Sequence, residues 1–306
     1  MSRRVTPEGP PFPPVELAAR VGPAGADPLR YDEVGRLTRA GILAALPDGW
    51  TFAGKRVLDF GCGAGRTLRH FLAEAEVGEF HGCDIDEPSI AWLDANLSPP
   101  FSVFVNGERP PLPLEDGSFD LIWAISVFTH ITDYWADWLV ELHRLLREGG
   151  LLVATIHGPL VSDDCAPVPP DTRAERGELV RVSPYRVGMN VVRYGHPWDE
   201  GGPAVFHSGW WIEQHWGRAF EIVSLREEGQ AGPRNARGQG QVVLRRRDVA
   251  ATVADLERID PADERELEAL RHNLRQLQYE TRELSEGRSW LERERAALLE
   301  QLSSSE

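Results

Sequence analysis

The chain has 306 residues, of which 42% are hydrophobic, and its formal net charge is −15 at pH 7. This length exceeds that of one ordinary domain, and the apolar content suffices for a substantial core. Proteins that bind the phosphate backbone of nucleic acids need clustered Lys and Arg, so the acidic excess disfavours a DNA or RNA substrate. No stretch of about 18 apolar residues is present to span a membrane, and the arginines near the start are not followed by the apolar part of a secretion signal. We therefore expect a soluble, cytoplasmic protein.

The first residues, 1–28, are rich in Pro and Gly and have no hydrophobic period, which predicts a flexible N-terminal arm. From Leu29 to Leu46 the apolar residues recur with a helical period, and Pro47 ends that pattern. We expect this helix to open a domain covering residues 29–249.

The segment RVLDFGCGAGR, residues 56–66, predicts a strand, a tight turn and the start of a helix. Gly61, Gly63 and Gly65 follow a short apolar run, and a helical pattern opens at Thr67. Because glycine has no Cβ, the turn can take positive φ and bring bare backbone against a ligand, towards which a helix start points free N–H groups. This arrangement favours a nucleotide-like ligand.

The residue at position 66 indicates which nucleotide is bound. A dinucleotide-binding fingerprint needs a small residue there, whereas this chain has Arg66. Asp59 stands two residues before the first glycine, and a carboxylate suits a cofactor end with a cationic amino group and a sulfonium better than a pyrophosphate. At this point the chain resembles the class I S-adenosylmethionine-dependent methyltransferases.

The second predicted strand, Glu79–Ile85, ends with an acidic residue, Asp84. A carboxylate at this position in nucleoside-binding α/β sheets accepts hydrogen bonds from both ribose hydroxyls, so Asp84 is the ribose candidate. Asp86 is expected to cap the next helix, and Ile85 to wall the adenine ring.

A third strand is predicted over Phe101–Val105. Asn106 and Glu108 follow at its carboxyl end, where an amide or carboxylate oxygen can accept from the adenine amino group. The sequence does not decide between these two residues.

The rest of the domain continues the alternation of strands and helices. A fourth strand is predicted from Phe119 to about Ser126, an amphipathic helix over Tyr134–Arg147 and a fifth strand over Leu151–Ile156. Two late strands, 221–225 and 241–245, have no helix between them and are predicted to form an antiparallel closing pair. The pattern predicts a doubly wound, mainly parallel α/β sheet.

Several segments together resemble one bacterial subgroup of these methyltransferases, often found beside or fused to glycosyltransferases. They include VLDFGCGAGRTLRHF, HGCDID, PPLPLEDGSFDLIWAISVFTHI, WLVELHRLLREGGLLVATIHG and FHSGWW, and the resemblance covers roughly residues 30–247. It implies a seven-stranded Rossmann-like fold and S-adenosyl-L-methionine as cofactor, but it supplies no acceptor, because function lies in sites grafted on folds. The candidate cofactor-binding residues are Asp59, Gly61, Gly63, Gly65, Asp84, Ile85, Asn106, Glu108 and Ser126. The three cysteines have no metal-like spacing, so no metal site is predicted.

Methyl transfer from a sulfonium is an in-line displacement, and a hydroxyl acceptor also needs a base. Three histidines follow strands or lie in the late insertion, namely His130, His157 and His207. Histidine is a candidate base because an unperturbed imidazole titrates near neutrality. His130 comes just after the fourth strand and is the first candidate, although fixing its loop by hydrogen bonds is an equally open role.

An insertion over residues 158–216 is rich in Pro, Gly and aromatic residues. Tyr185, Tyr194 and Trp198 lie in Gly- and Pro-rich surroundings and are candidates for contact with the flat face of an acceptor. Trp210, Trp211 and Trp216 precede a helix-like run and are expected to pack under the sheet.

The C-terminal segment, 250–306, is predicted to be an α-helical coiled-coil tail. Leucines recur every seven residues from Leu270 to Leu298, with further leucines at the companion positions. Self-pairing into a homodimer is the expected role, and binding of another protein is the alternative.

The sequence therefore predicts an S-adenosylmethionine-dependent methyltransferase that O-methylates a hydroxyl of a saccharide or glycosylated metabolite. A small-molecule or natural-product N- or O-methyltransferase is the alternative within enzymes. A methyltransferase-like scaffold in a glycan-assembly complex is the alternative outside them.

Overall fold

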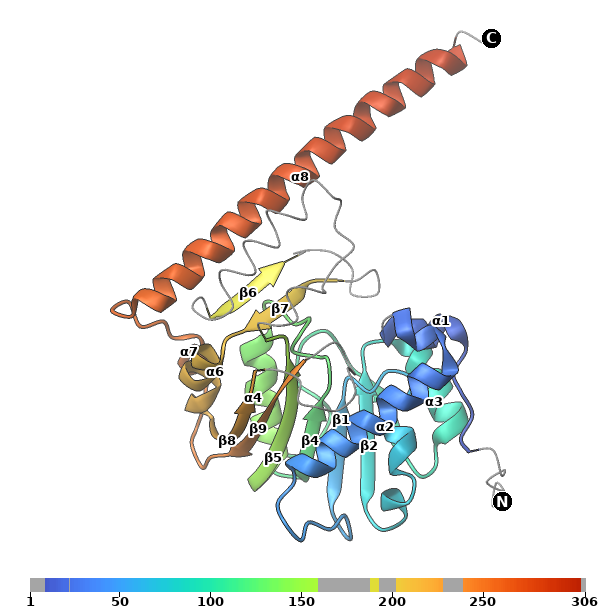
Figure 1. The fold of residues 1–306 in the computed structure, drawn as a ribbon, viewed down its shortest axis with the longest axis vertical. Helices are drawn as coiled ribbons and strands as arrows, with labels where there is room; N and C mark the ends of the chain where they lie inside the picture. Colours follow the sequence, from blue (N-terminus) through green and yellow to red (C-terminus); the bar gives the residue numbers. More distant parts are fainter. Residues whose placement is uncertain (1–8, 22, 159–187, 193–201, 228–238, 304–306) are drawn as a thin grey trace.

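A computed structural model describes residues 9–21, 23–158, 188–192, 202–227 and 239–303. Its centre is a seven-stranded sheet (Figure 1). The strand order is β3 (Ser102–Val105), β2 (Glu79–Asp84), β1 (Arg56–Phe60), β4 (Phe119–Ala124), β5 (Leu146–Ile156), β9 (Gly240–Arg246) and β8 (Phe220–Arg226). The first five strands are parallel, and β9 runs antiparallel to both β5 and β8. The predicted doubly wound sheet and its antiparallel closing pair are confirmed.

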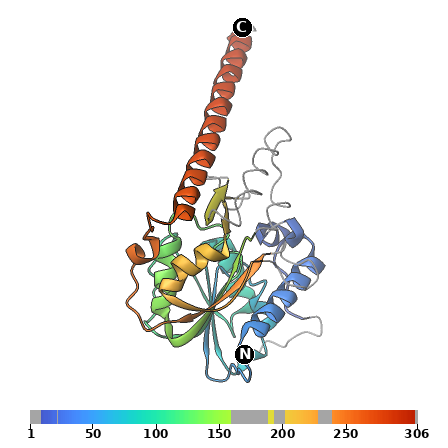
Figure 2. The same cartoon turned by 60° about the vertical axis from the view of Figure 1, so that its left-hand side comes forward.

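Helices cover both faces of this sheet, because the buried β-strands carry apolar side chains on both sides. In the described ranges, the helices that pack on the sheet include α2 (Pro28–Ala45), α3 (Glu87–Leu97), α4 (Trp135–Leu145) and α6 (Gly209–His215). One core cluster joins α4 and α6 to the sheet, and the other joins α2 and α3 to its opposite face. Figure 2 shows α4 and α6 on one side of the sheet and α2 on the other.

The helix predicted to open at Thr67 is replaced by two short 3-10 turns, η3 (Leu68–Phe71) and η4 (Glu74–Glu76). The helix α2 packs directly on this backbone, since a Cβ built on Gly35 would lie 2.2 Å from the carbonyl oxygen of Arg66. A narrower 3-10 coil fits this close approach. The prediction of a continuous helix after the glycine loop is therefore wrong.

Part of the segment predicted as an arm packs against the domain. It forms α1 (Val15–Ala18), η1 (Ala19–Val21) and η2 (Pro23–Ala26). The buried guanidinium of Arg69 donates to the backbone carbonyls of Pro10 (2.7 Å) and Pro11 (3.2 Å), and Arg20 forms an ion pair with Asp86. These contacts bring the N-terminal segment beside the glycine loop.

A separate hairpin, β6 (Met189–Val192) and β7 (Ala204–His207), lies beyond the carboxyl ends of β4 and β5. The backbone N–H of His207 donates to the carbonyl of His157 (3.0 Å), and that of Val205 to the carbonyl of Thr129 (2.9 Å). The hairpin is thus hydrogen-bonded to the end of the sheet at which ligands bind in α/β folds.

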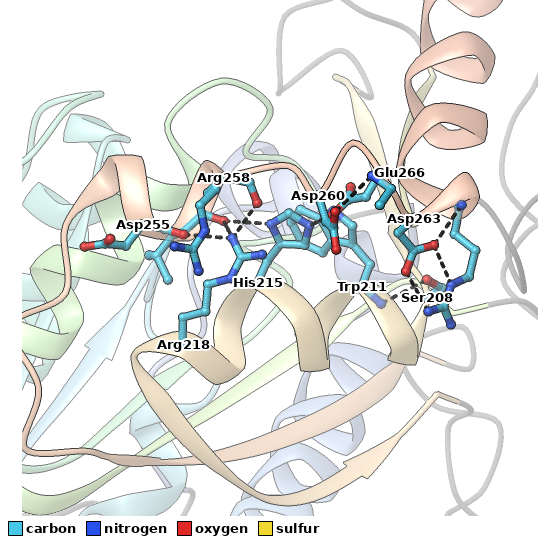
Figure 3. A network of polar contacts seen from close by, with 12 residues as sticks. Ser208, Trp211, His215, Arg218, Asp255, Arg258, Asp260, Asp263 and Glu266 are labelled. Carbon is cyan, nitrogen blue, oxygen red and sulfur yellow. Dashed lines mark hydrogen bonds and ion pairs between the residues drawn. The ribbon is translucent and has the colours of Figure 1, made fainter.

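The C-terminal segment consists of α7 (Val253–Glu257) and the 40-residue helix α8 (Glu264–Ser303), which projects away from the body (Figure 1). At its base, Glu266 Oε1 lies 3.1 Å from His215 Nε2, while His215 Nδ1 lies 2.7 Å from the carbonyl oxygen of Leu256 (Figure 3). About two turns further on, Asn273 Nδ2 donates to the carbonyl of Met189 at 2.8 Å. Leu256 is fully buried in the core, so the domain includes residues beyond 249.

None of the helices in the described ranges is both long enough and apolar enough to cross a membrane.

Candidate functional site

The glycine loop between β1 and η3 lies at the carboxyl end of β1. Gly61, Gly63 and Gly65 all have positive φ, at 80°, 51° and 78°. A Cβ on Gly61 would lie 2.3 Å from Val127, so neither the conformation nor the space tolerates a side chain there. The amides of Gly61 and Cys62 both donate to the carbonyl of Cys83, which holds the loop against β2.

Asp84, the last residue of β2, faces this loop. Its Oδ2 accepts from the amide of Gly63 at 2.7 Å, and its Oδ1 accepts from the amide of Asp86 at 2.9 Å. Burial raises the pKa of Asp84, and these two amide bonds partly oppose that rise. Ile85 follows with an exposed side chain. The structure therefore brings the ribose candidate, the loop and the adenine candidate together.

The two candidates at the end of β3 differ in placement. The backbone N–H of Asn106 donates to the carbonyl of Asp84 (3.0 Å), so Asn106 lies next to the ribose candidate. Its Oδ1 is buried and has no hydrogen-bond partner within the described part of the chain. The side chain of Glu108 is exposed. Asn106 is thus the better-placed acceptor for an amino group.

Asp59 lies on β1 beneath the loop and is 2% exposed. Burial, with a smaller contribution from the nearby Asp84 carboxylate, raises the pKa of Asp59 to about 7. Its Oδ2 has no hydrogen-bond partner among the residues that the structure describes. A buried carboxylate oxygen without a partner fits the cationic end of a cofactor, which would lower that pKa.

The chain leaves β4 through a strained residue. Ser126 has φ of 60°, a conformation that residues other than glycine seldom adopt and that clusters at functional sites. Its amide donates to Thr155 Oγ1 on β5 at 2.7 Å, and its Oγ accepts from Gln239 Nε2 at 2.5 Å. Two hydrogen bonds to neighbouring segments hold the strained backbone in place.

Two of the three candidate histidines lie together at this end of the sheet. The rings of His130 and His157 are 6.2 Å apart. The Nδ1 of His130 is 2.9 Å from the carbonyl oxygen of Pro203, and its side chain is exposed. The Nε2 of His157 lies 3.3 Å from Gln239 Nε2, while its Nδ1 is buried.

His207 is held apart from that pair. Its ring packs against Trp211 and Trp216 at 5.3 and 5.5 Å, and the residue is 1% exposed. Burial lowers the pKa of His207 to about 3, so it is neutral at physiological pH. Trp211 and Trp216 are themselves buried in the core, as expected. Tyr185, Tyr194 and Trp198 lie outside the described residues.

Sequence reasoning missed Gln239. Gln239 stands directly before a predicted strand, and its side chain contacts His157, 82 positions earlier in the sequence. No local motif indicates such a long-range contact. The positive φ of Ser126 could not be predicted either, because serine is not a residue type that favours this conformation.

Comparisons with known proteins agree with this geometry. Residues 58–154 match the family model described as a methyltransferase domain. The chain is 28% identical over 143 residues to phthiotriol/phenolphthiotriol dimycocerosates methyltransferase 1 of Mycobacterium ulcerans, covering 47% of this chain and 49% of that protein. It is 33% identical over 126 residues to 2-methyl-6-phytyl-1,4-hydroquinone methyltransferase of Synechocystis, covering 40% and 37%. These matches span about half or less of each relative's length.

The fold has a solved counterpart in one chain of the complex between the Haloferax volcanii Trm112 methyltransferase activator and a candidate methyltransferase. That chain superposes with a TM-score of 0.50 at 16% identity, covering 77% of this chain and 96% of its own length. This likeness concerns the fold alone.

Proposed function

We propose that the protein is a class I S-adenosylmethionine-dependent methyltransferase that O-methylates a hydroxyl of a saccharide or glycosylated metabolite. The match of residues 58–154 to the methyltransferase-domain model supports the methyltransferase assignment. S-adenosylmethionine supplies an electrophilic methyl group on a sulfonium. The chain's own residues must therefore hold the acceptor in line with that methyl and take up the hydroxyl proton.

The cofactor assignments rest on the placement of Asp84 beside the glycine loop and on the unpartnered oxygens of Asp59 and Asn106 described above. Asp84 would accept from the ribose hydroxyls, and Asn106 Oδ1 from the adenine amino group. Asp59 would face the cationic end, where a positive charge stabilises its ionised form. Gly61 and Gly63 have positive φ, which lets the loop follow its path past the carboxyl end of β1.

The observation that carries the proposal is the contact between His130 Nδ1 and the carbonyl of Pro203. A carbonyl oxygen only accepts, so in the neutral imidazole Nδ1 carries the hydrogen and Nε2 carries the lone pair. This is the tautomer that can take a proton from an acceptor hydroxyl. An N-methyltransferase acting on a neutral amine has less need of such an oriented base.

The other two histidines are less suited to that role. The Nε2 of His157 is engaged by Gln239 whichever way the amide is oriented, and its Nδ1 is buried away from an incoming acceptor. His207 is enclosed by tryptophan rings and holds a proton only in strong acid. We therefore assign the base to His130.

The named relatives suggest a second acceptor class, since their names refer to a phthiotriol lipid and to a phytyl hydroquinone. A small-molecule N- or O-methyltransferase with an apolar acceptor is accordingly the alternative function. A scaffold without catalysis has less support, because a non-catalytic site has no need of the glycine loop and the Asp84 contact.

The tail is proposed to join two copies of the chain. Its base contacts the body through Glu266, Ala269 and Asn273, and Leu270, Leu277 and Leu284, on the adjoining helix face, are exposed. Leucine at seven-residue spacing on an exposed helix face is the pattern that knobs-into-holes packing buries. Arg288 and Arg295 interrupt the same seam and oppose pairing there.

The deciding experiment is an assay for S-adenosylhomocysteine by mass spectrometry, with methyl glycosides, 2-methylhydroquinone and primary amines as separate probes. Turnover with a glycoside supports the proposal. Turnover with the hydroquinone or an amine alone supports the alternative, and cofactor binding without turnover of any probe supports the scaffold.

A further inference from the structure

Gln239 bridges three strands at the end of the sheet where an acceptor would lie. It directly precedes β9, and its side-chain amide reaches Ser126 after β4 and His157 after β5. Its Nε2 is 2.5 Å from Ser126 Oγ and 3.3 Å from His157 Nε2. Because an amide nitrogen carries two hydrogens, it can donate to both groups at once. The hydroxyl hydrogen of Ser126 then remains available to a third group.

The other end of the same amide lacks a protein partner. Gln239 Oε1 is buried and makes no hydrogen bond to any residue that the structure describes. A buried acceptor left in this state costs about 1 to 3 kcal/mol, and such groups in native proteins usually have a reason. A ligand hydroxyl would satisfy it.

A second buried amide adjoins the same place. Asn190 on β6 is 2% exposed, and neither its Nδ2 nor its Oδ1 has a partner in the described ranges. It stands directly opposite Phe206, whose ring is 5.3 Å from that of His157. Residues directly opposite in an antiparallel pair share a face, so Asn190 lies on the side of the hairpin that faces His157.

A third group lies next to the proposed base. Thr129, adjacent to His130, is fully buried, and its Oγ1 likewise has no partner among the described residues. The three orphaned side chains come from separate segments, and the β6–β7 hairpin or the contacts of His157 connect each to this end of the sheet. Amides and hydroxyls both donate and accept without carrying charge, which matches neutral hydroxyl groups rather than phosphate or a prenyl chain.

We propose that Gln239, with Asn190, reads the hydroxyls of a neutral polyhydroxylated acceptor such as a glycoside. Gln239 Oε1 accepts from a hydroxyl that is not methylated, and this contact sets the neighbouring hydroxyl towards His130. The inference rests on the proposed function and specifies its acceptor class. It assigns to Gln239 a role in specificity, separate from binding of the cofactor.

The chain supplies a matched control in Gln241, two residues after Gln239 and within β9. Its amide lies 3.4 Å from the carbonyl of Gly41 on α2 and contacts neither Ser126 nor His157 in the described structure. The full-length variants Gln239→Leu, Gln239→Glu and Gln241→Leu are compared with wild type. Calorimetry measures S-adenosylmethionine binding, and mass spectrometry measures turnover of methyl β-glucopyranoside, methyl α-rhamnopyranoside and 2-methylhydroquinone.

The expected result is that kcat/KM for the preferred glycoside falls tenfold or more in Gln239→Leu, chiefly through KM, because a site built for a hydroxyl is left unpaired. Gln239→Glu, which keeps an acceptor oxygen and the same shape, should recover part of the loss. Cofactor affinity and Gln241→Leu should stay within twofold of wild type. Thermal unfolding checks that each variant is folded, and Asn190→Leu provides a second test if Gln239→Leu is not.

Equal kinetics in Gln239→Leu and Gln241→Leu would overturn the inference. A wild-type protein that methylates 2-methylhydroquinone, but neither methylates nor binds either glycoside by saturation-transfer NMR, would also overturn it. If that protein still binds S-adenosylmethionine, the methyl-donor part of the proposed function stands. Failure of wild type to bind S-adenosylmethionine would instead remove the proposed function itself, and the acceptor assignment with it.

Discussion

The carboxylate of Asp84 accepts a hydrogen bond from the backbone amide of Gly63, 21 residues earlier, at 2.7 Å. This bond joins the end of β2 to the glycine loop, so one side chain both shapes the loop and faces the ligand site.

Replacement of Asp84 by Ala should weaken S-adenosylmethionine binding by about 1.5 to 3 kcal/mol, the range for losing hydrogen bonds to a charged group. Isothermal titration calorimetry measures the change. Asp94→Ala is the control, because Asp94 is an exposed carboxylate on α3. Unchanged affinity in Asp84→Ala would refute the ribose assignment.

Asp59 should make the protein without cofactor less stable as the pH rises. Burial raises its pKa to about 7 in the folded state, whereas an unfolded carboxyl titrates near 3.9. The stabilising protonated form is fully present below about pH 4, and its contribution is lost as the pH rises to about 7. Between pH 5 and pH 7.5, the free energy of unfolding measured in urea should therefore decline less in Asp59→Asn than in wild type.

The same carboxyl should release a proton when a cationic cofactor binds near it. Calorimetry at pH 6 in buffers with different ionisation enthalpies would detect this release. The release should disappear in Asp59→Asn; a value that persists in the variant would assign the proton to another group.

Replacement of His130 by Ala should lower turnover by about 10²- to 10⁴-fold, the usual contribution of a positioned base, while cofactor affinity changes no more than a few-fold. His81→Ala is a suitable control, because His81 is half-buried on β2 and packs edge-on against Phe119. Near-normal turnover in His130→Ala would exclude it as the base, and loss of cofactor binding would make its role structural.

The tail prediction is tested by light scattering. Glu substitutions at Leu284 and Leu291 place charges on the exposed leucine stripe and should convert a dimer into a monomer. Ser289→Glu, on an outward position of the same helix, should have no effect. Truncation at Val249 would confound this test, because it removes the buried Leu256 together with the tail. Equal, monomeric masses for all forms would remove the dimer.

The sheet was predictable because its signals are local. Short apolar runs, the glycine loop and the absence of a helix between the last two strands indicated a mainly parallel sheet with an antiparallel pair, and the family resemblance implied seven strands. The cofactor candidates followed from the same logic, since residues at the carboxyl ends of parallel strands converge.

The remaining features depend on contacts distant in sequence. The 3-10 turns after the loop reflect the approach of Gly35 on α2, which no pattern around Thr67 records. Likewise, His207 looks like His130 in sequence, and only the packing of Trp211 and Trp216 around it depresses its pKa. Environment, rather than residue type, separates the three histidines.

The length of α8 determines how far apart the two catalytic domains of a dimer would lie. At 1.5 Å per residue, its 40 residues extend about 60 Å. A parallel pair would put both catalytic domains at one end, where they could work on adjacent units of one polymer. An antiparallel pair would hold the two catalytic domains at opposite ends of the paired helices. Each domain would then bind a separate acceptor molecule or a distant part of a long one.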